Sequence, residues 1–254
     1  MFNSLDLLRR ARAAGLHLLI SAGVAMCAAL LVFGMWYPGF YRSLAGGDSL
    51  YVLLTSVDVI LGPLLTFAVF DRRKGWPHLR RDLAIIGLIQ LAALTYGMSV
   101  VMAARPIAMV FEFDRFRVLN RDQIRVDELP KALPAYRELP LTGPWLLGTR
   151  KARNAAESQD ALFTALDGVD LGQRPAFWQP YADSRSAALA KARPVSLLLA
   201  KYPARTAEIR ESLQSAGLQP ESATFLPVMA RGDWVAVLDK AGNPVSFLPL
   251  DGFI

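Results

Sequence analysis

Three long apolar runs within the first hundred residues constrain the fold of this chain more than any other feature. The runs cover about residues 16–37, 50–70 and 83–104. A helix of about 20 apolar residues is long enough to cross the hydrocarbon core of a bilayer. The chain is 53% hydrophobic with a mean hydropathy of +0.29, which is high for a soluble protein. The sequence therefore predicts a domain of three transmembrane helices over residues 1–105.

The first run has one alternative interpretation, the apolar part of a cleaved signal peptide. Such a segment is about 7–15 residues long and ends at a cleavage site of small residues. Here the run is longer and ends in Met35-Trp36-Tyr37-Pro38, and aromatic residues are typical of a membrane interface. We therefore expect an uncleaved helix.

The distribution of basic residues predicts how the helices are oriented. Residues 9–12 include three arginines and the loop 71–82 contains five basic residues, whereas the loop 38–49 contains only Arg42. Short cytoplasmic loops carry an excess of Lys and Arg. We therefore expect a multi-pass inner-membrane protein with a cytoplasmic N-terminus and, after three crossings, a C-terminal domain in the periplasm.

The net charge is concentrated in the membrane half. Residues 1–104 hold nine Lys and Arg against five Asp and Glu, and residues 105–254 hold nineteen against seventeen. A basic excess beside membrane helices favours lipid headgroups over nucleic acid as the partner. A merely solvated basic loop is the alternative.

Asp58 is the one charged residue within the second apolar run. Ionisable residues inside a membrane are costly and usually face the interior of a helix bundle. Counting about 1.5 Å per residue along antiparallel helices places Thr95 and Tyr96 at a similar height, with Gln90 lower. We therefore expect Tyr96 or Thr95 to hydrogen-bond to Asp58. The carboxylate would fix helix register or, as the less favoured alternative, sense a proton or a partner.

The second and third runs also contain residues that shape helix packing. Gly62 is followed by Pro63, and proline removes a backbone hydrogen bond and kinks a helix. Ala93 and Gly97 are small residues four apart, a spacing that permits close helix approach. This pattern fits internal packing as well as docking of a helix from another protein.

The pattern of residues 106–254 predicts one α+β domain. Strands are expected at 107–113, 116–119, 224–230, 234–239 and 245–250, and helices at 153–166, 183–192 and 204–215. A strand pair, then helices, then a meander predicts a small antiparallel sheet.

Catalytic and metal-binding motifs are missing from this domain. The two histidines, His17 at the start of the first helix and His78 in the basic loop, precede it, as does the single cysteine, Cys27. A nucleophile–histidine pair or a zinc site of histidine and cysteine ligands therefore cannot form there. We expect no enzymatic activity, no metal and no cofactor, with a carboxylate-based hydrolase as the alternative.

Several segments together resemble the type IV pilin accessory protein family of Gram-negative bacteria. The order of three helices and an external domain matches, and the resemblance covers the whole chain, least distinctively at about 120–220. The segments that carry the resemblance are 55–66, 81–83, 90–97, 105–111 and 114–116.

The resemblance implies a chaperone-like, non-enzymatic protein that assists assembly or stability of a cognate type IV pilin. Its partners would be the major pilin and other pilus assembly proteins. The helix-packing or partner-binding residues would be Asp58, Gly62, Pro63, Gln90 and Tyr96, and the domain-positioning residues would be Arg105, Pro106, Asp114 and Arg115. The alternatives are an envelope enzyme that modifies pilin or glycan, a sensor, and a structural subunit of an envelope complex.

Overall fold

The chain folds into two compact units in the computed structural model. The described residues are 4–71 and 75–254. The first unit comprises the chain up to Pro38 and Gly46–Ala104, and the second comprises Gly39–Ala45 and Arg105–Ile254. The second unit therefore includes a short stretch from between the first two apolar runs.

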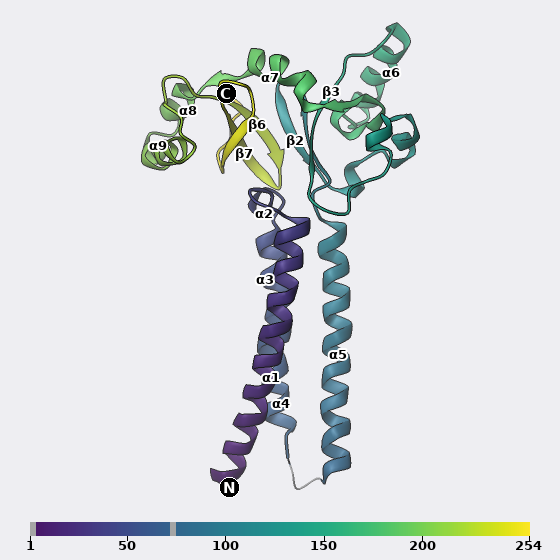
Figure 1. Cartoon of the computed structure of the whole chain (residues 1–254), viewed down its shortest axis with the longest axis vertical. Helices are drawn as coiled ribbons and strands as arrows, with labels where there is room; N and C mark the ends of the chain where they lie inside the picture. The colour runs from purple at the N-terminus through teal and green to yellow at the C-terminus, as the bar shows by residue number, and fades with distance from the viewer. Residues whose placement is uncertain (1–3, 72–74) are drawn as a thin grey trace. The chain divides into compact units, whose positions relative to one another are not determined.

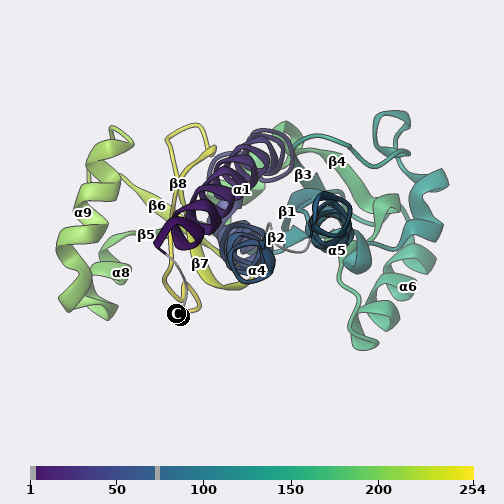
Figure 2. The same cartoon turned by 90° about the horizontal axis from the view of Figure 1, so that it is seen from below.

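The first unit is a bundle of three long helical segments (Figures 1 and 2). The bounds are Ser4–Leu31 (α1), Val32–Trp36 (π-helical η1), Gly47–Ser56 (α3), Val57–Leu61 (π-helical η2), Gly62–Val69 (α4) and Trp76–Ala103 (α5). Among the described residues, three spans are long and apolar enough to cross a membrane, Asp6–Trp36, Gly47–Val69 and Trp76–Ala103. Three basic residues of the expected 71–82 loop, Arg72, Arg73 and Lys74, lie outside the described residues.

The first helix begins at Ser4, well before the apolar run that begins near residue 16. Residues 4–15 are rich in Leu, Ala and Arg, which are strong helix formers. Asp6 in the first turn also favours the helix, because a carboxylate there interacts well with the helix dipole. Hydropathy identifies the part of a helix that is suited to lipid. Residues outside that part can also be helical, because their helix propensity is high.

Apolar side chains cover the outside of the bundle. Leu19, Leu53 and Leu88 are 72%, 68% and 70% exposed. Isolated leucines are common on soluble surfaces, but a continuous apolar surface of this kind is suited to lipid. The helical unit thus has the surface that a transmembrane bundle requires.

The second unit is built on a mixed sheet (Figure 1). Within the described residues it has eight strands, in the order β4-β3-β1-β2-β6-β7-β8, with β5 also paired to β6. The strands are Ala108–Glu112 (β1), Arg115–Leu119 (β2), Trp145–Thr149 (β3), Trp178–Pro180 (β4), Arg193–Pro194 (β5), Thr224–Ala230 (β6), Gly232–Leu238 (β7) and Pro244–Leu248 (β8).

The expectation of a small antiparallel sheet is wrong, because two of the strand pairs are parallel. β1 pairs with β3 in parallel, and β2 pairs in parallel with β6, where Phe116 lies opposite Val228. Parallel neighbours are joined through long connections, and the local sequence of a strand does not encode its partner. β3 and β4 were missed, since they are short and lie in segments rich in proline and aromatic residues.

Short helices accompany the strands of the second unit. They are Tyr41–Leu44 (α2), Ala155–Leu166 (α6), Arg185–Lys191 (α7), Ser196–Lys201 (α8) and Thr206–Ser215 (α9). α6, α7 and α9 overlap the helices expected at 153–166, 183–192 and 204–215. Asn154 caps α6 by accepting a hydrogen bond from the Glu157 amide at 2.8 Å, which is a favourable N-cap arrangement.

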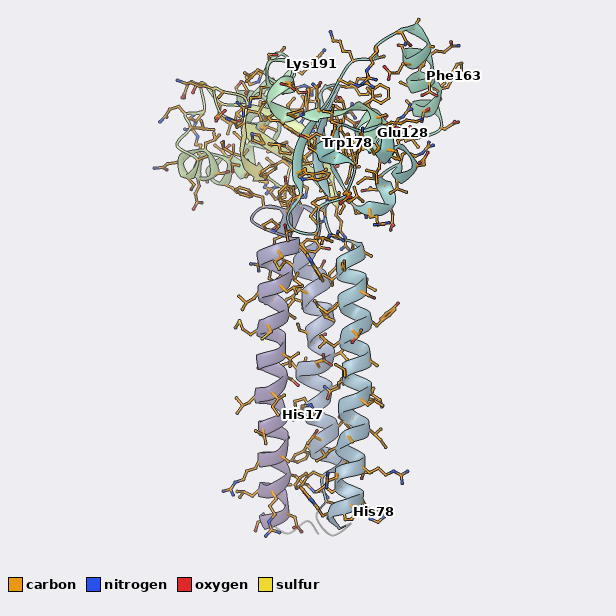
Figure 3. The ribbon with its side chains drawn as sticks, turned by 45° about the vertical axis from the view of Figure 1, so that its right-hand side comes forward. His17, His78, Glu128, Phe163, Trp178 and Lys191 are labelled. Atoms are coloured by element: carbon orange, nitrogen blue, oxygen red, sulfur yellow. The ribbon has the colours of Figure 1, made fainter. Side chains whose placement is uncertain are left out.

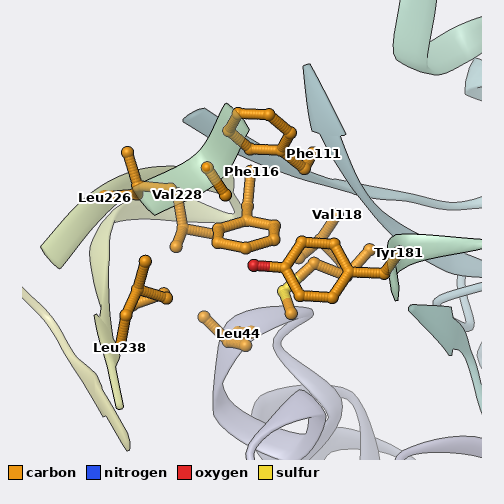
Figure 4. Packing of buried hydrophobic residues seen from close by; sticks show 11 residues of the cluster. Leu44, Phe111, Phe116, Val118, Tyr181, Leu226, Val228 and Leu238 are labelled. Atoms are coloured by element: carbon orange, nitrogen blue, oxygen red, sulfur yellow. The ribbon is translucent and has the colours of Figure 1, made fainter. Parts of the chain in front are cut away.

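The main core of this unit lies around Phe116 (Figure 4). The Phe116 ring is fully buried, with ring centroids 5.7 Å from Phe111 and 5.6 Å from Tyr181. Burying such a side chain stabilises the fold by about 1.5–3 kcal/mol. Leu44 of α2 is also fully buried in this cluster, and its carbonyl accepts a hydrogen bond from the Arg231 amide at 3.0 Å. The segment 39–45 is therefore an integral part of the second unit.

Candidate functional site

The second membrane span departs from regular α-helix at the polar residue that the sequence singles out. Val57–Leu61 is π-helical and includes Asp58, and α4 follows with Gly62 and Pro63 in its first turn. Proline cannot donate the usual backbone hydrogen bond, so the turn before it is free to adopt another geometry. π-helical turns inside α-helices are frequent at functional sites.

Asp58 lies in the interior of the bundle. The residue is 7% exposed, and its Oδ1 has no hydrogen-bond partner among the described residues. Gln90 of α5 approaches from the opposite helix, and its Nε2 donates to the backbone carbonyl of Asp58 at 3.3 Å. Buried polar atoms are normally hydrogen-bonded, so an unpartnered carboxylate oxygen marks a place where a further donor can bind.

A second polar contact lies about two turns further along the same span. His17 Nδ1 is 2.5 Å from Thr66 Oγ1, and Thr66 is almost fully buried. Figure 3 labels His17 on α1. Because α1 starts at Ser4, His17 lies near the middle of this helix and not at its start as expected.

Gly62 leaves the room in which these side chains meet. A Cβ at this position would clash with Nε2 of Gln90 and would lie 2.9 Å from Nε2 of His17. Glycine therefore allows the ends of these side chains to pack closely here, and its backbone has an ordinary helical conformation. This gives the predicted packing role of Gly62 a specific steric cause.

The polar groups line one pocket of about 210 Å³ within the bundle. Its polar lining consists of His17, Ser21, Asp58 and Gln90, and its apolar lining includes Ile20, Val24, Leu91 and Leu94. Ser21 is 6% exposed. An apolar pocket with a carboxylate, an imidazole and an amide can accept a hydrogen-bond donor from a neighbouring helix.

Asp58 does not have the partner expected from the sequence. Tyr96 is 73% exposed, and the Thr95 hydroxyl donates to the Leu91 carbonyl of its own helix at 2.7 Å. Tyr96 and Thr95 lie at a suitable height along α5, but the rotation of the helix about its axis turns them away from Asp58. At about 100° per residue, Tyr96 is turned by about 120° from Gln90, so only Gln90 faces Asp58.

The four predicted domain-positioning residues all belong to the second unit. Arg105 is 7% exposed and donates to the Pro140 carbonyl at 3.0 Å, and Pro106 is buried beside it. Asp114 accepts a hydrogen bond from Arg115 Nε at 2.8 Å in the β1–β2 hairpin. These contacts stabilise the start of the sheet. The role of the four residues in positioning the C-terminal domain stays a prediction.

Sequence reasoning missed His17, Ser21 and Thr66 as members of the polar site. A signal was present, because His17 and Ser21 are four residues apart in an apolar run and share one helix face. Thr66 follows Asp58 by eight residues and lies on the same side of the span. Polar residues recurring at helical spacing within an apolar run would have indicated the site.

Comparison with known proteins identifies relatives of this chain. The family model "Fimbrial assembly protein FimB" matches residues 6–46, which include His17, Ser21 and the segment 39–45. Two fimbrial assembly proteins of Dichelobacter nodosus, of serogroup E1 and serogroup I, are each 37% identical over 246 residues, covering 96% of this chain and 96% of theirs.

A third relative covers only part of the chain. The fimbrial assembly protein of serogroups C1 and C2 of the same organism is 42% identical over 122 residues, which are 48% of this chain and 93% of that protein. No solved structure matches the chain significantly. The resemblance to an accessory family of type IV pili is thereby confirmed. This chain belongs to the fimbrial assembly protein family.

Proposed function

We propose that this protein is a non-enzymatic accessory factor that assists assembly of a cognate type IV pilin at the inner membrane. The observation that carries the proposal is the similarity to fimbrial assembly proteins over 96% of both chains, which includes the membrane spans and the C-terminal unit alike. Residues 105–254 contain no histidine or cysteine, which favours binding over nucleophilic or zinc chemistry.

The fold supports a topology with an odd number of membrane crossings. The segment 39–45, between the first two spans, belongs to the same compact unit as residues 105–254, after the third span. Both stretches must then lie on one side of the membrane. The arginines at residues 9–12 favour the opposite, cytoplasmic side for the N-terminus, so the C-terminal unit would face the periplasm.

The pocket around Asp58 is the part of the bundle best suited to receive a pilin helix. Its apolar lining would pack against the helix, and the unpartnered Oδ1 would accept a hydrogen bond from it. Hydrogen bonds between membrane helices contribute about 0.6 kcal/mol on average and at most about 1.7 kcal/mol. The contact would therefore select a partner and its register without holding it permanently.

Deletion of the gene, with complementation by variants, tests the proposal. We expect the deletion to lose surface fimbriae, Asp58→Ala to restore them poorly, and Thr95→Val to restore them fully. Thr95 is the matched control, because its hydroxyl bonds only its own helix in the same bundle. A photo-crosslinker at Leu91, which lines the pocket, should capture pilin, whereas one at the exposed Ile89, on the opposite side of α5, should not. Normal fimbriae in the deletion strain would refute the proposal.

A further inference from the structure

The C-terminal unit presents an apolar groove beside α6. The helix has no buried residue, and Leu162, Phe163 and Leu166 are 62%, 57% and 75% exposed; Figure 3 labels Phe163. The groove has a volume of about 550 Å³ between α6, including Leu162, and Phe113 and Phe177. We call it the α6 groove. Of the three exposed side chains, Leu162 lines the groove, and Phe163 and Leu166 extend the apolar surface of α6 beside it. A contiguous exposed apolar patch of this kind marks an interaction site.

A basic pocket of about 400 Å³ lies on the same unit. Its charged lining consists of Lys131, Arg137, Arg150, Arg153 and a single carboxylate, Asp183. Lys131 and Arg153 are exposed, and within residues 4–71 and 75–254 no side-chain hydrogen bond or ion pair engages either of them. The pocket therefore has positive charge that its own residues do not neutralise.

Arg150 is already fixed in place. Its guanidinium donates to Glu157 at 2.7 and 2.9 Å and to the Ala176 carbonyl at 2.8 Å, and it stacks on the Phe177 ring at 4.6 Å. Hydrogen bonds from Arg150, together with one from the Arg153 backbone, lower the pKa of Glu157 to about 2. Glu157 is thus ionised at neutral pH and offsets Arg150. Arg137 donates to the neutral Ala132 carbonyl at 3.2 Å, and Lys131 and Arg153 are the cations with the most freedom to reach a ligand.

The α6 groove and the basic pocket are built on the same two short segments. In the first, Arg150 and Arg153 line the pocket while Lys151, Ala152 and Asn154 line the groove. In the second, Ala176 and Trp178 line the pocket while Phe177 lines the groove. The two cavities adjoin where Arg150 of the pocket stacks on Phe177 of the groove. A ligand that lies across this contact would meet apolar side chains and cations together.

We propose that the α6 groove and the basic pocket together bind a polypeptide segment that carries an apolar side chain and a carboxylate a few residues apart. Charge complementarity selects the carboxylate, and the apolar groove favours a peptide over a free anion. The inference rests on the proposed function for the identity of the partner, since an acidic segment of a fimbrial protein would dock here. The chemistry of the surface is independent of that identity.

Peptide titration of the full-length protein in detergent micelles tests the binding chemistry. The probe is a fluorescein-labelled peptide that repeats Leu-Ala-Glu, followed by anisotropy. Repeats of Leu-Ala-Gln and of Ala-Ala-Glu test the carboxylate and the apolar side chain separately. We expect each change of peptide to weaken binding roughly tenfold, because it removes one of the two kinds of contact. The double variant Lys131→Glu/Arg153→Glu should weaken binding at least as much, because it places like charges across the interface.

The matched control is Arg210→Glu/Lys240→Glu, which makes the same change in charge at two exposed residues outside the groove and the pocket. We expect this control to bind as the wild type does, and Lys131→Gln/Arg153→Gln to weaken binding less than the glutamate pair. Equal weakening by the control pair, binding unaffected by either change of peptide, or displacement of the peptide by equimolar inorganic phosphate would overturn the inference.

A fimbriation assay separates this inference from the proposed function. If Lys131→Glu/Arg153→Glu assembles fimbriae normally while the gene deletion does not, docking of a fimbrial segment at this surface is refuted and the assembly role stands. If the deletion itself leaves fimbriae intact, the assembly role fails whatever the peptides do. Loss of fimbriae in the double variant, with the protein still present in the membrane, supports both.

Discussion

Replacing Arg174 by methionine should destabilise the C-terminal unit by about 3–5 kcal/mol, the cost of breaking a buried ion pair. Arg174 is 7% exposed, and its guanidinium donates to Glu128 at 2.9 Å and to Asp160 at 2.7 Å, with the Phe177 ring 5.0 Å away. Glu128 is 4% exposed, and its Oε2 has no partner among the described residues. Losing Arg174 would leave this carboxylate buried and uncompensated.

The double variant Arg174→Met/Glu128→Met distinguishes the charge effect from lost packing. Removing both charges should recover stability to within about 1–2 kcal/mol of the wild type, because apolar replacements of a buried pair are often tolerated. Asp160 is 60% exposed at its side chain and can be solvated when Arg174 is gone. The two single changes should therefore be strongly non-additive.

Denaturant unfolding of the full-length protein in detergent, followed by tryptophan fluorescence, measures these differences. Trp178 reports on this part of the unit, since it is 1% exposed and donates to the Gly172 carbonyl at 2.7 Å. The midpoint should fall while the slope is unchanged. A loss below about 1 kcal/mol for Arg174→Met, or a double variant as unstable as the sum of the singles, would refute the reasoning.

Three further predictions concern other contacts. Glu157 is ionised down to a pKa of about 2 because Arg150 donates to it, so its contribution to stability is present above pH 4.5 and is lost as the pH falls towards 2; Glu157→Gln should flatten this part of the stability–pH curve. Phe116→Ala should cost about 3–5 kcal/mol in denaturant unfolding. Gly97→Ala should lower the thermal stability of the protein in micelles, since its Cβ would clash with Leu54, whereas Gly87→Ala on the same helix, whose Cβ would meet nothing within 4 Å, should not.

The features predicted well from the sequence are those with a local physical cause. A span reveals itself by its length of apolar residues, and the meander at the end of the chain by short apolar runs around a turn at 240–243. α6 could be predicted because its helical periodicity and its Asn154 cap lie within one stretch. In each case the information needed is contained within one continuous stretch of the chain.

Features that depend on contacts between distant parts of the chain could not be predicted from the local sequence. The parallel pair of Phe116 with Val228 joins strands more than a hundred residues apart, and neither strand carries a local mark of its partner. The choice of Gln90 over Tyr96 as the neighbour of Asp58 depends on how α5 is rotated about its axis. That rotation is fixed by packing across the whole bundle, including the space left by Gly62.

The segment 39–45 connects the two units at a place that was not expected from the sequence. Its apolar residues Phe40, Tyr41 and Leu44 have helical spacing. This spacing is typical of a helix that buries one face and is not expected of a loop exposed to water. The chain passes between the two units at residues 38–39, 45–46 and 104–105. Any displacement of the C-terminal unit must therefore carry the ends of the first two spans with it, or else pull Leu44 out of the core. Truncating a buried leucine costs about 2–5 kcal/mol, so a force on the C-terminal unit would reach the helices of the first unit through three backbone connections, two more than a simple tether provides.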